Sequence, residues 1–277
     1  MTPGRLAIVA AVLAIQPPPS QPIFQSKVEI VRIDVSVMRG GQPVQGLTSA
    51  NFTLTDNGVP QDVESVVVDR LPLNVTLVLD SSRSLIGERL AHLVQAGNAL
   101  TTALRPDDHA ALVTFSHQVA LTVPMTTDRQ AIRSALAGLE ARGSTALRDA
   151  VHLAVQLDPR DRARSLLLVF TDGHDTVSWL TEDAVLDTVR RSGLVIHVVR
   201  VESDAFLDRL TQASGGRAWS ATSDRQLREL FTRALDEMRA RYLLTYTPSV
   251  DTAGWHSVKV SLKNVRGDVT ARPGYSR

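Results

Sequence analysis

The chain of 277 residues is 43% hydrophobic and 21% charged, which is typical of a globular protein with enough apolar surface to bury a core. A formal net charge of +1 and an aromatic content of 4% supply neither the basic surface nor the stacking side chains that nucleic-acid binding needs. The lack of cysteine excludes disulfides, thiolate zinc sites, iron–sulfur clusters and cysteine nucleophiles.

The first residues have the pattern of an export signal. Arg5 precedes an apolar run at 6–15, and the prolines at 17–19 then end any helix. The run is shorter than the roughly 20 residues that a membrane-spanning helix needs. We expect residues 1–20 to be a signal peptide and the mature chain to be secreted or periplasmic, without an integral membrane segment. No Ala-x-Ala cleavage motif follows, so an uncleaved anchor stays open as the alternative.

Residues 21–71 are predicted to form an N-terminal β segment. Apolar and polar residues alternate, imperfectly, over 28–37. Shorter strands are predicted at 51–54 and 61–68, around Asp56-Asn57-Gly58, because Asn-Gly is a strong two-residue turn signal. Groups of two or three strands are marginal alone, so this segment needs a partner.

From residue 72 to residue 240, apolar strands alternate with amphipathic helices. Strands that are apolar throughout indicate a sheet covered on both faces. They are predicted at 75–79, 110–115, 166–170 and 194–199, with an antiparallel edge strand at 118–123 and a short last strand at 218–221. Helices are predicted at 90–104, 129–139, 146–157, 183–191, 207–213 and 224–241. This alternation predicts an α/β fold with a doubly wound, mostly parallel, Rossmann-like sheet.

Residues 241–277 return to short strands, predicted at 242–246, 257–262 and 269–271. These strands are also too few to form a core. We therefore predict that 21–71 and 241–277 pack on each other as one β unit beside the α/β domain. The alternative is two separate extensions.

Three loops at one edge of the predicted sheet carry oxygen ligands. Loops that follow parallel strands gather at the carboxyl ends of those strands, where sites of α/β proteins form. The candidate ligands are Asp80, Ser82, Ser84, Thr145 and Asp172. Two carboxylates and three hydroxyls suit a hard cation, Mg²⁺ first, with Mn²⁺ or Ca²⁺ as alternatives. An unfilled position on such a cation favours a carboxylate from outside.

These residues, in this order and on these elements, resemble the metal-ion-dependent adhesion site of the von Willebrand factor A (VWFA) domain, and the resemblance covers residues 72–240. It rests on Asp80-x-Ser82-x-Ser84, on Thr145 in the segment GSTALRDA and on Asp172 in Thr-Asp-Gly. The resemblance implies that Asp80 and the two serines bind the metal. It implies that Thr145 binds directly or through water, that Asp172 acts mainly through water, and that a partner's Asp or Glu completes the shell.

The flanking segments resemble more specifically the bacterial exported VWFA-related proteins abundant in acidobacteria. The shared features are a Gly-Leu-Thr-x-x-x-Phe segment at 46–52, the acidic-Asn-Gly turn, a Tyr-Leu-Leu strand at 242–244 and Arg-Pro-Gly-Tyr at 272–275. This resemblance implies the same arrangement of a β unit around an A domain.

Neighbours of the candidate ligands have plainer interpretations. His174 and Asp175 follow Asp172, and we interpret them as solvated loop positions, with modulation of the metal as the alternative. Asp149, four residues after Thr145, is interpreted as a surface charge, with support of the metal ligands from behind as the alternative. Two roles stay open: orientation of the loop for Thr171 and partner selection for Arg83.

The sequence therefore predicts a metal-dependent protein-binding module and not an enzyme. The Gly-x-Ser-x-Gly motif and the glycine-rich nucleotide-binding motifs are absent. The expected partner is a protein ligand that supplies an Asp or Glu carboxylate. The alternative is a structural part of an envelope assembly in which the metal only stabilises loops.

Overall fold

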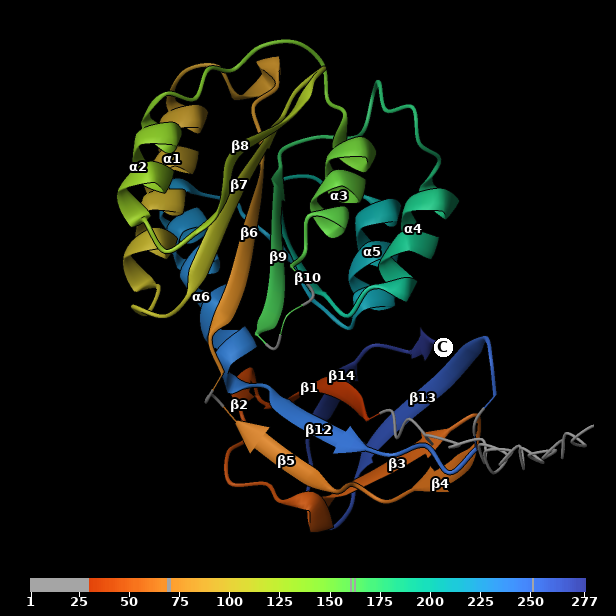
Figure 1. Ribbon diagram of the computed structural model, residues 1–277. Coiled ribbons are helices and arrows are strands. Elements are labelled where there is room, and N and C mark those ends of the chain that lie inside the picture. Colours follow the sequence, from red (N-terminus) through yellow and green to blue (C-terminus); the bar gives the residue numbers. More distant parts are fainter. Residues whose placement is uncertain (1–29, 69–70, 160, 162, 251) are drawn as a thin grey trace, which may run out of the picture.

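The computed structural model describes residues 30–68, 71–159, 161, 163–250 and 252–277. The predicted signal peptide at 1–20 lies outside these residues. The described chain forms a layered α/β part and a smaller part made of β-strands, which lies below the first in Figure 1. No helix in the described ranges has the length and apolar character needed to cross a membrane.

The α/β part is built on a six-stranded sheet with the strand order β11-β10-β9-β6-β7-β8. Its strands are β6 (Leu73–Asp80), β7 (His109–Phe115), β8 (Val119–Thr126), β9 (Arg164–Thr171), β10 (Val195–Arg200) and β11 (Ala218–Ser220). All neighbours are parallel except β8, which pairs with β7 as an antiparallel edge strand. Every residue of β6 is buried, as expected for a strand covered on both faces.

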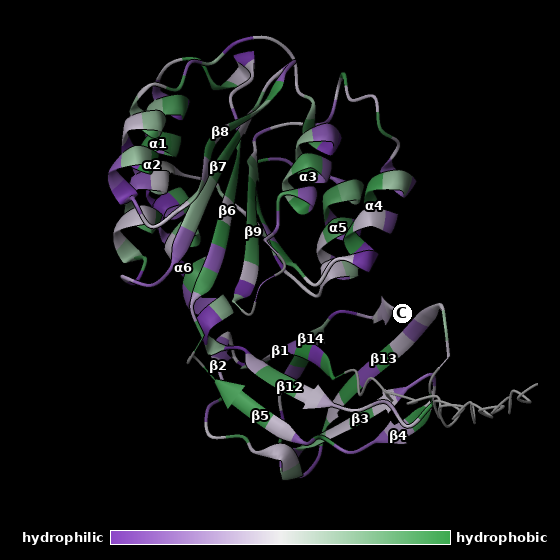
Figure 2. Cartoon of the chain, in the orientation of Figure 1, coloured by the Kyte–Doolittle hydropathy of each residue, from purple (hydrophilic) through white to green (hydrophobic). Residues whose placement is uncertain are grey.

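Helices cover both faces of this sheet (Figure 1). One face carries α1 (Glu88–Ala103), α2 (Arg129–Ala137) and α6 (Asp224–Ala240), and the other carries α3 (Leu147–Gln156), α4 (Glu182–Arg191) and α5 (Ala205–Ser214). Successive residues of β6 enter different cores: Leu77 packs with Phe231 on the first face, and Val78 packs with Val151 on the second. The hydrophobic strands between the two helix layers are evident in Figure 2. The predicted α/β fold with a doubly wound, mostly parallel sheet is confirmed.

The flanking β unit combines strands from both ends of the chain in two antiparallel sheets. The first has the order β14-β1-β12-β5, with β2 paired to β1, and the second has the order β15-β13-β3-β4. The N-terminal strands are β1 (Val31–Arg39), β2 (Gln42–Pro43), β3 (Phe52–Asp56), β4 (Val59–Gln61) and β5 (Ser65–Val68). The C-terminal strands are β12 (Tyr242–Tyr246), β13 (Trp255–Leu262), β14 (Asp268–Ala271) and β15 (Gly274–Ser276). The N- and C-terminal segments therefore share both sheets, as predicted.

One predicted strand of this unit is wrong. The segment 61–68 forms the end of β4 and the whole of β5, and these two strands belong to different sheets. The chain leaves the second sheet after β4, at Asp62. The backbone N–H of Glu64 then donates to the carbonyl of Thr245 in β12 at 2.9 Å, where pairing with the first sheet begins. An apolar run cannot reveal such a change of partner, because both sheets accept the same residue types.

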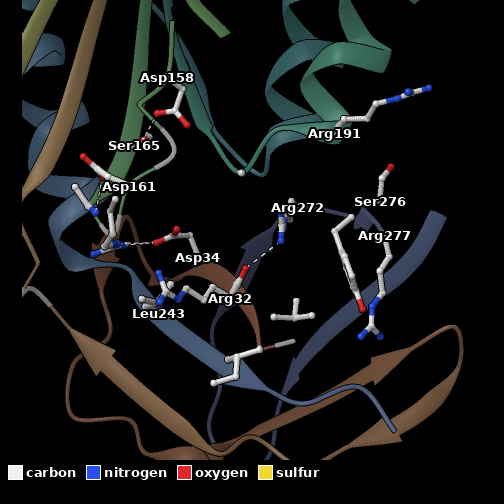
Figure 3. A pocket seen from close by; sticks show the side chains of 16 residues that line it. Arg32, Asp34, Asp158, Asp161, Ser165, Arg191, Leu243, Arg272, Ser276 and Arg277 are labelled. Atoms are coloured by element: carbon white, nitrogen blue, oxygen red, sulfur yellow. Dashed lines mark hydrogen bonds and ion pairs between the residues drawn. The ribbon is translucent and has the colours of Figure 1, made fainter. Parts of the chain in front are cut away.

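Polar contacts join the β unit to the α/β part (Figure 3). Arg164 Nε donates to Asp34 Oδ1 at 2.8 Å, and Arg272 Nη2 donates to the carbonyl of Arg32 at 3.0 Å. The other terminal nitrogen of Arg272 donates to the carbonyl of Ser192 at 3.3 Å, so this side chain spans the two parts. A cavity of about 400 Å³ lies beside these contacts.

A buried ionic cluster at the base of the α/β part reinforces this junction. Glu237 Oε2 lies 2.6 Å from His197 Nε2 and accepts from Arg241 Nε at 2.9 Å. Burial opposes ionisation of Glu237, but its contacts with His197 and Arg241 hold its pKa well below the ordinary value. Arg217 contacts the same carboxylate at 3.3 Å and also donates to Thr270 of the β unit at 3.1 Å.

Candidate metal centre

The centre begins where β6 ends, at Asp80, whose residue is completely buried. One carboxylate oxygen of Asp80 accepts from the backbone N–H of Ser82 at 2.8 Å. The other accepts from the hydroxyl of Thr171, the last residue of β9, at 2.7 Å. Burial raises the pKa of Asp80, and the nearby charge of Asp172 adds to that effect. Thr171 thus orients the first predicted ligand from the neighbouring strand.

Two of the three predicted loops meet through a row of hydrogen bonds. The hydroxyls of Ser82 and Ser84 are 3.0 Å apart, at the short 3₁₀ turn η2 (Arg83–Leu85). Ser84 Oγ then donates to Asp172 Oδ1 at 2.7 Å. Ser82 and Asp172 are both buried, whereas Ser84 between them is exposed, so this row reaches the surface at Ser84.

The third loop, which carries Thr145, lies against the first. The backbone N–H of Arg83 donates to the carbonyl of Gly143 at 3.0 Å, and the N–H of Arg142 donates to the carbonyl of Ser81 at 2.8 Å. Thr145 itself is 8% exposed. Among the described residues, no hydrogen bond joins its hydroxyl to the other four candidates. The fold therefore brings the five predicted residues to one edge of the sheet. Hydrogen bonds connect four of them in a chain: Asp80, Ser82, Ser84 and Asp172.

The donor set fits a hard divalent cation. It consists of two buried carboxylates and serine and threonine hydroxyls, which are the ligands that Mg²⁺, Mn²⁺ and Ca²⁺ accept. No group of three or more His, Asp or Glu side chains suited to a metal occurs in the described ranges, so the hydroxyls are essential to this fit. A cation at this point would also offset the cost of two carboxylates buried close together.

A basic residue that sequence reasoning missed lies beside the centre. Arg89, in the first turn of α1, places Nη1 3.3 Å from Asp172 Oδ2. Its own side chain remains 64% exposed, whereas that of Asp172 is 2% exposed. Its only sequence signal is its position five residues after Ser84, in the first turn of the following helix. That position alone does not distinguish Arg89 from other surface arginines.

The neighbours singled out from the sequence have other partners. His174 Nδ1 lies 2.6 Å from Asp204 Oδ2, and this hydrogen bond raises the pKa of His174. Asp149 accepts from two backbone N–H groups of the loop after β9, at 3.0 Å each, so it positions that loop and is more than a surface charge. Asp175 accepts from Arg148 Nη2 at 2.9 Å. Arg83 is exposed.

Comparison with known proteins agrees with this fold. Residues 75–174 match the family model of the von Willebrand factor type A domain. Inter-alpha-trypsin inhibitor heavy chain H4 of Bos taurus is 28% identical over 167 residues, which are 53% of this chain and 18% of that protein. The chain thus spans less than a fifth of the length of this relative.

Solved structures show the same fold. A von Willebrand factor type A protein from Catenulispora acidiphila has a TM-score of 0.57 at 13% identity, over 87% of this chain and 74% of that one. Proximal thread matrix protein 1 from the mussel byssus, with a zinc-occupied MIDAS motif, has a TM-score of 0.55 at 16% identity, over 64% of this chain and 48% of that one. The α/β part of the chain therefore has the fold of a von Willebrand factor type A domain, and residues 75–174 carry the match to that family model.

Proposed function

We propose that this chain is an exported protein-binding module whose A domain uses a divalent cation to capture an acidic residue of a protein partner. Asp80, Ser82, Ser84, Thr145 and Asp172 would hold the cation, with Mg²⁺ as the first candidate. The observation that carries the proposal is the row from Ser82 through Ser84 to Asp172, beside the buried Asp80. Export rests on the signal pattern of residues 1–20.

The chemistry of the site supports a carboxylate as the captured group. A divalent cation supplies a directional electrostatic contact to a carboxylate oxygen. The two aspartates balance its charge, and the neutral hydroxyls leave it electron-poor. Thr171 holds the carboxylate of Asp80 in place, and Arg89 adds an exposed positive charge at the rim. An acidic side chain is therefore attracted before it reaches the centre and is held once there.

The contacts of the serine and histidine support a binding role over a hydrolytic one. A hydrolytic site would require Ser82 to lie within hydrogen-bonding reach of His174. The hydroxyl of Ser82 instead faces Ser84, and the His174 ring faces Asp204. These partners leave the pair without the link that activates a serine nucleophile.

The structural alternative, in which the metal only stabilises three loops, is separated from the proposal by a capture experiment. The full-length protein is crosslinked in the native envelope in Mg²⁺ or in EDTA, beside the Asp172→Asn variant. We expect one set of crosslinked proteins that requires both Mg²⁺ and Asp172. Crosslinks that persist unchanged in EDTA and in the variant would contradict capture through the metal and favour the structural role.

A further inference from the structure

Trp179 is almost fully exposed at the edge of the sheet that carries the metal centre. Its relative exposure is 95%, in the loop between β9 and α4. A tryptophan side chain offers 150–250 Å² of mostly apolar surface, roughly, and exposing it to water is unfavourable. Within the described residues, its indole belongs to none of the hydrophobic cores and makes no hydrogen bond.

The loop that carries Trp179 has a fixed backbone. The N–H groups of Trp179 and Leu180 donate to the two carboxylate oxygens of Asp149 at 3.0 Å each. The side chain of Leu180 packs against the core that also contains residues of α3 and α4, whereas the side chain of the preceding residue, Trp179, faces outward. Asp175 holds the start of the same loop through Arg148 and through Ser178. Because the backbone is already ordered, a partner that covers Trp179 pays little for ordering the loop.

This loop is also joined to the metal centre. The N–H of Thr176 donates to the carbonyl of Thr145 at 2.9 Å, and the N–H of Thr145 donates to Thr176 Oγ1 at 2.9 Å. Trp179 follows Thr176 by three residues, so its Cα lies within about 11 Å of the Thr176 Cα, from the extended reach of the chain. A ligand held at the metal is therefore within reach of the indole.

Apolar surface near the centre extends beyond Trp179. Ile86, Val177 and Val201 are exposed on the loops that follow β6, β9 and β10. With Trp179 they make up four of the ten large hydrophobic residues that are exposed in the described ranges. A hollow of about 170 Å³ lies next to Asp172, and Leu85, Phe170 and Leu227 contribute apolar lining to it.

The charge at this edge specifies what kind of group accompanies the apolar contact. Arg83 and Arg89 are exposed on the metal loop and the helix that follows it. The acidic residues nearby are already engaged, since Asp172 contacts Arg89 and Asp204 contacts His174. The edge thus presents the exposed charge of Arg83, beside an Arg89 that already pairs with Asp172, next to an apolar surface. It complements a partner that is acidic and apolar at adjoining positions.

We infer that this edge binds a protein segment in which an Asp or Glu lies within a few residues of a bulky apolar side chain, and that the apolar side chain packs on Trp179. The inference rests on the proposed function, because the acidic residue is the group captured by the metal. Exposed tryptophans on ordered backbone are typical anchors of protein interfaces. Trp179 is therefore a specificity-determining residue for the partner.

Immobilised synthetic peptides test this specificity. Each peptide has a central Asp in a Gly/Ser background, with Leu, Phe or Gly placed up to four residues away on either side. The probe is the full chain in Mg²⁺. We expect Leu and Phe peptides to be retained about tenfold or more above their Gly counterparts, as for a tryptophan anchor. Trp179→Ala should abolish that preference, and Trp179→Phe should restore part of it.

The control variant is Trp255→Ala, which removes another exposed tryptophan, 42% exposed, in the distant β unit. It should retain the wild-type preference, and all variants should take up the same amount of metal. Equal retention of Leu, Phe and Gly peptides, an unaltered preference in Trp179→Ala, or no retained peptide at all would overturn the inference. If peptides are retained equally in EDTA, or equally when Asn replaces the central Asp, capture through the metal is overturned. The inference is then overturned with it.

Discussion

The hydroxyl of Tyr275 donates a hydrogen bond of 2.9 Å to Asp56 Oδ2, across 219 positions of the sequence. The hydroxyl of Tyr246 donates to the same oxygen at 3.0 Å, and His256 Nδ1 lies 2.8 Å from Asp56 Oδ1. Asp56 is 4% exposed. Its carboxylate therefore ties strand β3 to three C-terminal strands. The acidic-Asn-Gly turn and the terminal Arg-Pro-Gly-Tyr motif, noted separately in the sequence, meet at this point.

Replacement of Tyr275 by Phe should destabilise the β unit. The Asp56 oxygen keeps the donor on Tyr246, so we expect a loss of about 1 kcal/mol, the lower end of the cost of a missing buried hydrogen bond. Urea unfolding followed by tryptophan fluorescence, to which Trp255 of the β unit contributes, measures the change. Ser276→Ala is the matched control, because Ser276 is the exposed neighbour in the same strand. Equal stability of Tyr275→Phe and the control would show that this hydrogen bond contributes nothing.

The same cluster predicts a pH dependence of stability. His256 has an acceptor at each ring nitrogen, Asp56 at Nδ1 and the carbonyl of Thr252 at 2.7 Å from Nε2, so the doubly protonated ring satisfies both. The Thr252 carbonyl, together with Asp56, raises the pKa of His256 above its ordinary value. The folded state then binds the proton more tightly than the unfolded state does.

The contribution of His256 should be complete below the unfolded pKa, about 6.5, and should fade as the pH rises through the higher folded pKa. The difference in unfolding free energy between wild type and His256→Gln should therefore be largest in mildly acidic buffer and shrink above neutrality. Urea titrations at a series of pH values measure it. A difference that grows with rising pH would contradict the assignment of a charged ring.

Local sequence patterns were sufficient to predict the helices and strands of the α/β part and to place the candidate ligands at one edge of its sheet. Apolar strands such as 75–79 and amphipathic helices such as 146–157 are defined by their own periodicity. The ligands follow strands whose carboxyl ends share one edge, so chain order alone places them together. By contrast, the partner change at Asp62 and the contact of Arg89 with Asp172 depend on segments far apart in sequence. Such contacts leave no periodic signal in a single chain.

Deletion of residues 242–277 should expose the N-terminal strands. β1 lies between β12 and β14 in its sheet, so the deletion removes both of its principal neighbours. Limited proteolysis should then cleave the segment 30–68 rapidly and spare 73–240, whose sheet and two cores contain none of the deleted strands. Continued protection of 30–68 in the truncated protein would mean that this segment folds independently.

Gly143→Ala should weaken metal binding without removing a ligand. Gly143 has φ +72°, which strains any residue with a Cβ, and an added Cβ would lie 2.1 Å from His117 Nδ1, so the loop that carries Thr145 or the His117 ring must shift. We expect metal affinity to fall about tenfold or more, as for other substitutions that disturb the residues orienting a metal ligand. The control is Gly138→Ala, where an added Cβ meets nothing closer than 3.7 Å. Equal affinities of the two variants would argue that the Thr145 loop does not contribute to the metal centre.

Titration calorimetry with Mg²⁺ and Mn²⁺ tests the central claim most directly. The wild-type chain should bind one cation per molecule, and so should Asp236→Ala, which alters an exposed aspartate on α6. Asp80→Ala and the nearly isosteric Asp172→Asn should each lose or strongly weaken that site while keeping the circular dichroism of the folded protein. Equal cation uptake by the wild type and by both site variants would contradict a metal centre at Asp80, Ser82, Ser84, Thr145 and Asp172.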